Sequence, residues 1–313
     1  MKGDFPMKKI SIKNAILIVA FLISIFVLGF KSVQYCLLNN VKANDKSLKL
    51  NASKSPVAIK ASENKDKLKD EIQPKTIYSI LGNSNKLSSK EKASRDAWIA
   101  QVVDLANKNI DTLFINGFTK EKKVCLTFDD GPDLAATPKV LAILKENNIK
   151  GSFFFIGENV RLYPNIVKEA YNSGNLVLSH SYSHPEFTKL KEEDIDNQLE
   201  KTETEIYKII GKKPAIIRPP YGDINQNTID ILSKANYKTV LWSIDTLDWS
   251  QREKTNIVNN VINNIRPGDI ILMHTGKDKE ASIDALPEII ANLKEMGYSF
   301  TTIDELLNIK AYK

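Results

Sequence analysis

Three histidines occur in the chain of 313 residues, and each lies at or just after the end of a segment with the composition of a β-strand. Two of them, His180 and His184, have i, i+4 spacing, which places both imidazoles on one side if the loop makes a helical turn. Two imidazoles and one carboxylate would form a three-ligand site for zinc or a similar divalent ion, with one position open for water. The alternative is a pair of solvent-facing loop histidines.

Two adjacent acids, Asp129 and Asp130, could supply the carboxylate. They end a β-rich run and precede Gly131 and Pro132, a pair that favours a sharp turn, so we expect their side chains to point in different directions. One carboxylate could bind the ion while the other stays free as a base. The alternative is an acidic pair that only caps the turn before a helix. Because a catalytic metal site needs both imidazoles and a carboxylate, the combination favours the metal site.

A regular alternation of strand-like and helix-like segments begins at Lys123. The predicted strands span residues 124–129, 151–157, 176–180, 215–219, 239–243, 269–274 and 299–303. The predicted helices span residues 138–147, 160–173, 192–210, 226–236, 254–265 and 283–296. Repeated βα units imply a parallel sheet, open or closed into a barrel. The residues capable of chemistry fall at the carboxyl ends of these strands, where such folds build active sites: Asp129, Asp130, His180, Arg218, Asp245 and His274.

Five ordered segments of the sequence resemble the NodB-like polysaccharide deacetylases, carbohydrate esterase family 4. They read TFDDGP (127–132), HSYSH (180–184), RPPYG (218–222), DTLDW (245–249) and IILMH (270–274). The likeness covers about residues 121–313. It implies an α/β fold, a distorted (β/α) barrel of about seven parallel strands, and metal-dependent hydrolysis of N-acetyl groups on a polysaccharide.

The resemblance also implies a role for residues of the first three segments. Asp130, His180 and His184 would hold one divalent metal ion, with zinc expected first and cobalt, nickel or manganese as alternatives. Asp129 would be the catalytic base, and Arg218 would orient it. Amide hydrolysis needs a nucleophile stronger than neutral water, and a bound divalent ion lowers the pKa of water to about 7.

The remaining segments would supply the general acid and the walls of the substrate site. His274 would protonate the departing amine, and Asp248 would hold that imidazole in its charged form. The residues expected to contact substrate are Pro219, Tyr221, through its backbone N–H at the oxyanion, and Trp249, in the acetyl pocket. One position departs from the family pattern: the residue after the catalytic histidine is often Asp, whereas here it is Thr275. Since Asp248 is the expected partner of His274, we expect activity to be kept.

The charge of the chain is unevenly distributed. Residues 1–120 carry 20 basic and 10 acidic residues, whereas residues 121–313 carry 24 basic and 28 acidic residues, so the net charge of +6 comes from the amino-terminal part. That part has no interleaved aromatic residues and no groove-reading motif, which argues against nucleic-acid binding. The two cysteines, Cys36 and Cys125, are too few for a disulfide framework or a cysteine-rich zinc module.

An apolar run of sixteen residues, 15–30, follows several lysines and predicts a membrane segment. We expect residues 1–38 to form a basic cytoplasmic tail and a single-pass transmembrane anchor in the cell membrane, with the rest of the chain outside the cell. The alternative is a signal peptide cleaved near residues 41–43, with secretion of the remainder.

Three further regions follow this segment. Residues 39–89 are rich in Lys, Ser, Asn and Asp and predict a disordered polar linker. Residues 90–120 predict a helical lead-in, which Ser88 or Ser89 could cap. Residues 121–313 form the predicted catalytic domain.

An anchored extracellular deacetylase would meet cell-wall glycan, so peptidoglycan N-acetylglucosamine is the expected substrate. N-acetylmuramic acid, chitin oligomers, poly-N-acetylglucosamine and acetylated xylan are alternatives, and no obligate protein partner is inferred. A different class, a catalytically idle glycan-binding wall protein, would be favoured by loss of a metal ligand or of the base, and none is lost. A secreted metallopeptidase is another alternative, but the HExxH pattern of zinc proteases is absent from the sequence, which argues against it.

Overall fold

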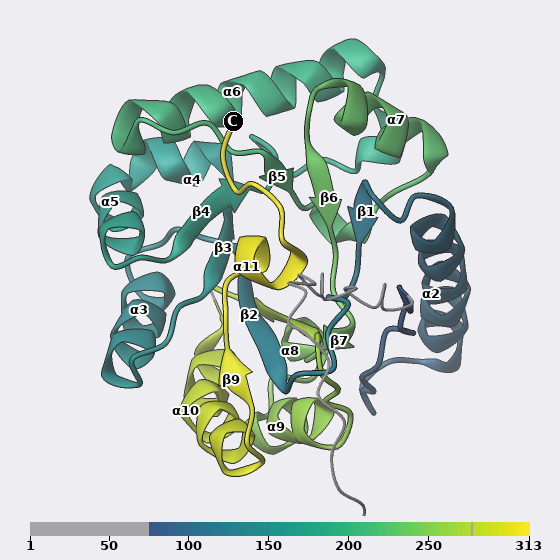
Figure 1. Ribbon diagram of the computed structural model, residues 1–313, viewed down its shortest axis with the longest axis vertical. Coiled ribbons are helices and arrows are strands. Elements are labelled where there is room, and N and C mark those ends of the chain that lie inside the picture. Colours follow the sequence, from purple (N-terminus) through teal and green to yellow (C-terminus); the bar gives the residue numbers. More distant parts are fainter. Residues whose placement is uncertain (1–74, 277) are drawn as a thin grey trace, which may run out of the picture. The chain divides into compact units, whose positions relative to one another are not determined.

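The computed structural model describes residues 75–276 and 278–313 (Figure 1). The predicted membrane anchor, residues 1–38, and most of the predicted linker lie outside these residues. Among the residues described, no helix is both long and apolar enough to cross a membrane.

A single sheet of nine strands organises the fold. The strands are β1 (Leu113–Phe114), β2 (Lys123–Asp130), β3 (Ser152–Phe155), β4 (Leu176–Ser179), β5 (Ile216–Ile217), β6 (Lys238–Val240), β7 (Ile244–Asp245), β8 (Ile270–His274) and β9 (Ser299–Phe300). Their order is β1-β6-β5-β4-β3-β2-β8-β7, with β9 beside β2, and every pairing is parallel. The path runs from β1 to β7 and these two strands are not paired within the described ranges, so the sheet forms a half-barrel.

The parallel βα architecture predicted from the sequence is confirmed, with two corrections. The sheet has nine strands instead of about seven, since the prediction lacks the two-residue strands β1 and β7. The predicted helix 160–173 is two helices, because Pro164 starts a new one and restricts the backbone of Tyr163 before it.

Helices follow most of the strands and cover the outside of the sheet (Figure 1). They are α2 (Ser89–Lys108), α3 (Ala136–Glu146), α4 (Gly157–Leu162), α5 (Pro164–Asn172), α6 (Glu192–Ile210), α7 (Gln226–Lys234), α8 (Asp248–Gln251), α9 (Lys254–Ile262), α10 (Glu280–Glu295) and α11 (Ile303–Leu307). Two short 3-10 turns, η1 (Phe187–Lys189) and η2 (Pro220–Gly222), lie in the loops after β4 and β5.

Both faces of the sheet are buried, and β3 shows why. Its three consecutive phenylalanines are fully buried, and side chains alternate between the faces of a strand. Phe153 and Phe155 pack with helices α3, α5, α9 and α10 in one core cluster, whereas Phe154 belongs to the cluster on the opposite face. Burial on both faces explains the continuous apolar runs that predicted these strands.

Within the predicted helical lead-in, residues 90–120, the structure has most of α2 followed by strand β1, and the start of α2 is set by a capping box between Ser88 and Glu91. The chain is packed before this helix begins. Ile80 and Ser84 are 3% and 1% exposed, and Leu81 forms a parallel bridge with Ile244 in β7. The last part of the predicted linker 39–89 therefore belongs to the folded unit.

Candidate active site

The structure brings together the three residues predicted to bind metal. Asp130 ends β2 and His180 follows β4, two strands away in the sheet. Nε2 of His180 and Nε2 of His184 lie 3.6 Å and 3.3 Å from Oδ1 of Asp130. One ligand atom from each residue lies within 4.8 Å of the other two. The group supplies one carboxylate oxygen and two imidazole nitrogens, a donor set that suits zinc and related divalent ions.

Backbone geometry and hydrogen bonds orient these ligands. Asp130, Ser181 and His184 have φ angles of 76°, 63° and 61°, a region that residues other than glycine rarely adopt. Nδ1 of His180 lies 2.7 Å from the carbonyl oxygen of Arg218, so the Nδ1–H group donates there and Nε2 stays free for a cation. Strained backbone held by surrounding contacts is typical of functional sites.

Asp130 is the anionic member of this cluster. Burial alone would raise the pKa of its carboxyl group, but the facing imidazoles of His180 and His184 outweigh burial and lower that pKa well below its usual range. The side chain is 31% exposed, so it lies at the boundary between the protein interior and the pocket.

Asp129 is hydrogen-bonded by a buried arginine. Nη1 of Arg218 donates to Oδ1 of Asp129 at 2.7 Å and to Oγ1 of Thr127 at 2.9 Å. Nε and Nη2 of Arg218 donate to backbone carbonyls of β6 and the loop after it, and the guanidinium lies 4.1 Å from the ring centre of Phe154. The arginine is thus fixed on all sides. It holds Asp129 beside the metal ligands, with Oδ2 3.9 Å from Nε2 of His180.

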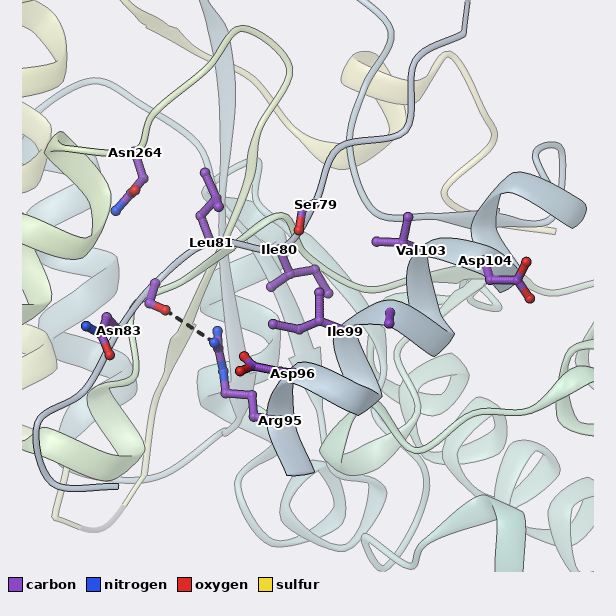
Figure 2. Close-up of a pocket in the computed structure, with 12 residues that line it drawn as sticks. Ser79, Ile80, Leu81, Asn83, Arg95, Asp96, Ile99, Val103, Asp104 and Asn264 are labelled. Atoms are coloured by element: carbon purple, nitrogen blue, oxygen red, sulfur yellow. Dashed lines mark hydrogen bonds between the residues drawn. The ribbon is translucent and has the colours of Figure 1, made fainter. Parts of the chain in front are cut away.

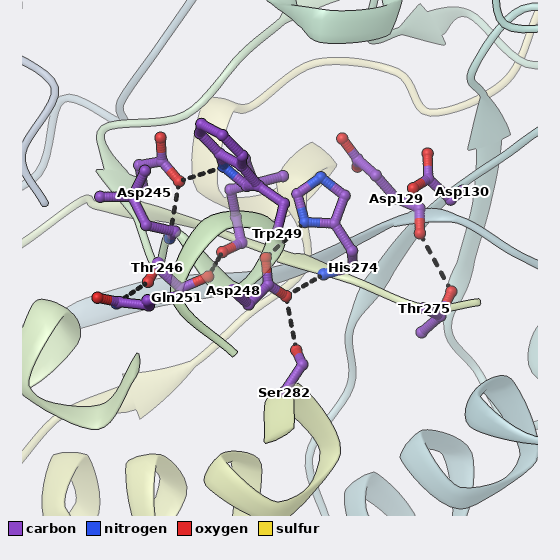
Figure 3. Close-up of polar contacts among 12 residues, drawn as sticks. Asp129, Asp130, Asp245, Thr246, Asp248, Trp249, Gln251, His274, Thr275 and Ser282 are labelled. Atoms are coloured by element: carbon purple, nitrogen blue, oxygen red, sulfur yellow. Dashed lines mark hydrogen bonds and ion pairs between the residues drawn. The ribbon is translucent and has the colours of Figure 1, made fainter. Parts of the chain in front are cut away.

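His274 and Asp248 form a second pair, in which the carboxylate is buried and the imidazole side chain is 15% exposed (Figure 3). Nδ1 of His274 lies 2.7 Å from Oδ1 of Asp248, and the other carboxylate oxygen accepts the backbone N–H of His274 and the hydroxyl of Ser282 at 2.9 Å and 2.7 Å. Burial lowers the pKa of the imidazole, but the charge and hydrogen bond of Asp248 outweigh it and raise the pKa of His274 to about 9. The imidazole is therefore protonated at neutral pH and can act as an acid.

Thr275, at the position that departs from the family pattern, has a structural task. Its backbone N–H and its hydroxyl both donate to the carbonyl oxygen of Asp129, at 2.9 Å and 3.1 Å (Figure 3). The residue is fully buried. It ties the end of β8, which carries His274, to the end of β2, which carries Asp129.

A pocket of about 850 Å³ contains these groups. Its lining includes the metal ligands, Asp129 and His274, together with the side chains of Tyr221 and Trp249, which are 64% and 42% exposed. Tyr221 has a φ of 62°, and its ring lies 4.5 Å from that of His184. Two exposed aromatic side chains beside a polar centre are a suitable surface for a sugar.

Pro219 is also a predicted substrate contact. It is buried and does not line the pocket, unlike Tyr221 and Trp249. Its carbonyl oxygen instead accepts the N–H of Gly222 at 3.1 Å, within the turn that projects Tyr221.

Several residues of the site carry no sequence signal. Ser282 lies near the start of α10, outside the five motifs, and its hydroxyl donates to Asp248 in α8. The pocket lining also includes residues of α2 and the residue before its cap, among them Leu87, Ser94 and Trp98. A helix that reads as a packing element thus forms part of the site.

Comparison with known proteins agrees with this geometry. Residues 116–240 match the family model for polysaccharide deacetylase. A peptidoglycan-N-acetylglucosamine deacetylase of Bacillus cereus is 43% identical over 193 residues, which cover 61% of this chain and 70% of that protein. The peptidoglycan-N-acetylmuramic acid deacetylase PdaA of Bacillus subtilis is 36% identical over 198 residues, which cover 62% of this chain and 74% of that protein.

Solved structures of polysaccharide deacetylases are also similar to this chain. The crystal structure of the Bc1960 peptidoglycan N-acetylglucosamine deacetylase is similar with a TM-score of 0.64 and 39% identity, over 66% of this chain and 98% of that chain. The structure of BA3943 from Bacillus anthracis, described as a pseudoenzyme of carbohydrate esterase family 4, has a TM-score of 0.59 and 31% identity, over 62% of this chain and 68% of that chain. The chain therefore belongs to the NodB-like polysaccharide deacetylases of carbohydrate esterase family 4, and it is a hydrolase.

Proposed function

We propose that this protein removes N-acetyl groups from peptidoglycan, with N-acetylglucosamine as the preferred sugar. One observation carries the proposal: the ion pairs Asp129–Arg218 and His274–Asp248 lie beside the Asp130, His180 and His184 cluster, and Asp129 and His274 line the same pocket as that cluster. The pocket thus offers a carboxylate and a protonated imidazole, a base and an acid, beside a set of metal ligands.

The ligand cluster fits one divalent cation. It has one carboxylate and two imidazoles, and the Nδ1–H of His180 is already bound to a backbone carbonyl. Zinc suits this donor set best, with cobalt, nickel and manganese as alternatives. When bound, such a cation polarises a carbonyl group and lowers the pKa of water to about 7.

The protein's own groups have the following tasks. Asp129 accepts the proton of the attacking water, while Arg218 fixes its carboxylate. The backbone N–H of Tyr221 donates to the carbonyl oxygen as negative charge develops there. His274 donates its proton to the amine nitrogen as the carbon–nitrogen bond breaks, so that acetate and a free amino sugar leave. Trp249 forms the wall against the acetyl methyl group.

The choice of peptidoglycan rests on the relatives. The proteins from Bacillus cereus and Bacillus subtilis are named for two different sugars of peptidoglycan, so N-acetylmuramic acid is the first alternative. Chitin oligomers, poly-N-acetylglucosamine and acetylxylan use the same chemistry. A catalytically idle glycan-binding protein is the alternative of another class, since one similar structure is a pseudoenzyme. The presence of the metal ligands, base and acid favours an active enzyme.

The proposed location is the outer side of the cell membrane. Residues 1–38 would anchor the chain, and the part of the predicted linker 39–89 that precedes the folded unit would form the tether to the wall. Secretion after cleavage near residues 41–43 is the alternative.

The test is mass spectrometry of purified wall glycans and N-acetylglucosamine oligomers after incubation with the full chain and zinc. We expect loss of acetyl groups from the N-acetylglucosamine units of peptidoglycan and release of free acetate. The Asp129→Asn variant is the control for a contaminating activity. Unchanged masses for every glycan, with the protein folded and supplied with zinc or cobalt, would contradict the proposal.

A further inference from the structure

The segment before α2 lies against the turn that follows β7. Leu81 donates its backbone N–H to Ser243 at 2.9 Å and accepts the N–H of Asp245 at 2.8 Å. Its parallel bridge with Ile244 extends the sheet past β7. The amino-terminal segment is therefore hydrogen-bonded to the strand that leads into the DTLDW motif.

Gly82 occupies a position where no side chain fits. Its φ is +132°, and a Cβ atom there would lie 2.1 Å from the carbonyl oxygen of Asp245. The contact continues at Asn83, whose N–H donates to Oδ1 of Asn260 at 2.9 Å. Nδ2 of Asn260 donates in turn to the carbonyls of Asn83 and Thr246, each at 2.9 Å. The segment is thus fixed to the turn on both sides of Asp245.

The turn after β7 contains a residue in an unfavourable backbone conformation. Leu247 has a φ of 55°, which is unfavourable for a residue with a branched side chain. Oδ1 of Asp245 accepts the N–H of Leu247 at 2.9 Å and the indole N–H of Trp249 at 3.3 Å (Figure 3). One carboxylate oxygen therefore orients both the strained backbone and the aromatic wall of the substrate pocket.

The other oxygen of Asp245 is bound by Arg95 of α2. Nη2 of Arg95 lies 3.3 Å from Oδ2 of Asp245, and Nη1 donates to the carbonyl oxygen of Gly82 at 3.2 Å. Figure 2 shows Arg95 between α2 and residues 79–83, at the edge of a second hollow of about 730 Å³. Asp245 is 2% exposed, and a buried carboxylate that loses its cationic partner is strongly destabilised.

We propose that Arg95 is a positioning residue that acts through Asp245 to hold Trp249 in the wall of the substrate pocket. Helix α2 precedes residues 116–240, the part that matches the family model, so this contribution comes from outside the matched region. The inference rests on the proposed function for its turnover measurement, but the position of Trp249 can also be measured without turnover.

The experiment compares full chains carrying Arg95→Gln, Arg95→Lys and Lys92→Gln. Lys92 lies on the exposed side of the same helix and is the matched control. With N-acetylglucosamine oligomers, we expect Arg95→Gln to lower kcat/KM about tenfold, mainly through KM, as for one lost charge-assisted hydrogen bond. Arg95→Lys keeps the positive charge and should retain most of the kcat/KM of the unmodified chain. Lys92→Gln should have the same kcat/KM as the unmodified chain.

A spectroscopic measurement reports the same contact without turnover. The emission of Trp249 is obtained as the difference between each protein and the same protein with Trp249→Phe. We expect Arg95→Gln, but not Lys92→Gln, to shift this emission to longer wavelength. Because Arg95→Gln leaves a buried carboxylate unpaired and can impair folding, the comparison is repeated with Asp245→Asn, which keeps an acceptor oxygen without needing a cation. In that background Arg95→Gln should leave the emission of Trp249 unchanged.

The outcomes distinguish a failure of the role proposed for Arg95 from a failure of the proposed deacetylase function. Equal kcat/KM and equal Trp249 emission for Arg95→Gln and Lys92→Gln would overturn the role of Arg95. An effect of Arg95→Gln that is equally large with Asp245→Asn would also overturn it, because the residue would then not act through Asp245. If the unmodified chain releases no acetate from any glycan, the proposed function fails, and the emission of Trp249 alone decides on Arg95.

Discussion

Replacement of Asp248 by Asn tests whether His274 is the general acid and whether Asp248 keeps its imidazole protonated. Asp248 is 2% exposed and receives hydrogen bonds from the ring and backbone of His274 and from Ser282. Asn has nearly the same shape, so the main changes are the loss of one negative charge beside the imidazole and of one of the two acceptor oxygens. The pocket and the ligands of the proposed metal site are otherwise kept.

The size of the effect follows from the pKa of His274, which is raised from 6.5 to about 9. A change of that size corresponds to about 3 kcal/mol. Burial acts against the charged imidazole, and Asp248 is the first of the groups that outweigh it, ahead of Asp130 and Asp129. A cation bound at Asp130 offsets the charges of those two carboxylates, which leaves Asp248 as the group that keeps the proton on His274.

The expected loss depends on pH. A general acid with a raised pKa is active below that pKa and inactive above it, so the unmodified protein should lose activity as the pH rises through about 9. Near pH 8 an imidazole with a pKa of about 9 is about 90% protonated, whereas one with a pKa of about 6.5 or lower is at most about 3% protonated, a difference of roughly thirtyfold.

The assay is acetate release from N-acetylglucosamine oligomers between about pH 6 and pH 10. For Asp248→Asn we expect the alkaline decline of kcat/KM to begin about two pH units lower and the rate near pH 8 to fall at least about thirtyfold. Asp104→Asn, on the exposed side of α2, is the matched control. An alkaline decline that stays near pH 9 in Asp248→Asn, with a rate near that of the control, would refute the assignment of His274 as the acid held by Asp248.

Three further predictions concern the base and the metal ligands. Asp129→Asn should keep the fold and bind zinc normally but lose about a hundredfold or more in kcat, measured by acetate release and by metal content; a rate near normal would place the base elsewhere. Arg218→Lys should lose the planar contacts to Asp129 and to the backbone carbonyls, with a drop in kcat and a destabilisation of about 3 kcal/mol in denaturant unfolding, and full stability would contradict the role given to this pair. Exhaustive chelation should abolish acetate release and added zinc or cobalt should restore it, whereas release that survives chelation would exclude the metal mechanism.

The sequence could predict the main elements because each of them is buried in a pattern that its apolar residues reveal. Strands that are buried on both faces, such as β2 and β3, read as short apolar runs, and α6 was predicted with the bounds that the structure has, 192–210. The parallel arrangement then brings the carboxyl ends of the strands to one edge, so the positions of Asp129, His180 and His274 near one another follow from topology.

The contacts that the sequence could not predict are those set by packing between distant segments. Arg95 is one arginine in a helix with many charged residues, and nothing in its spacing indicates that its partner is Asp245, 150 positions later. Ser282 likewise reaches Asp248 from another helix. The linker prediction extended to residue 89 because residues 75–88 are mostly polar, and a segment can pack through backbone hydrogen bonds, as Leu81 does, without an apolar pattern.

Three buried carboxylates around the pocket each have one cationic partner: Asp129 with Arg218, Asp248 with His274, and Asp245 with Arg95. A buried carboxylate is tolerated only when it is paired and hydrogen-bonded. The partner also decides what each acid can do. An arginine keeps its proton, so Asp129 remains a carboxylate that can accept one, whereas His274 can give its proton away. The same residue type therefore supports a base in one pair and an acid in the other, and the third pair holds the turn on which Asp248 and Trp249 are carried.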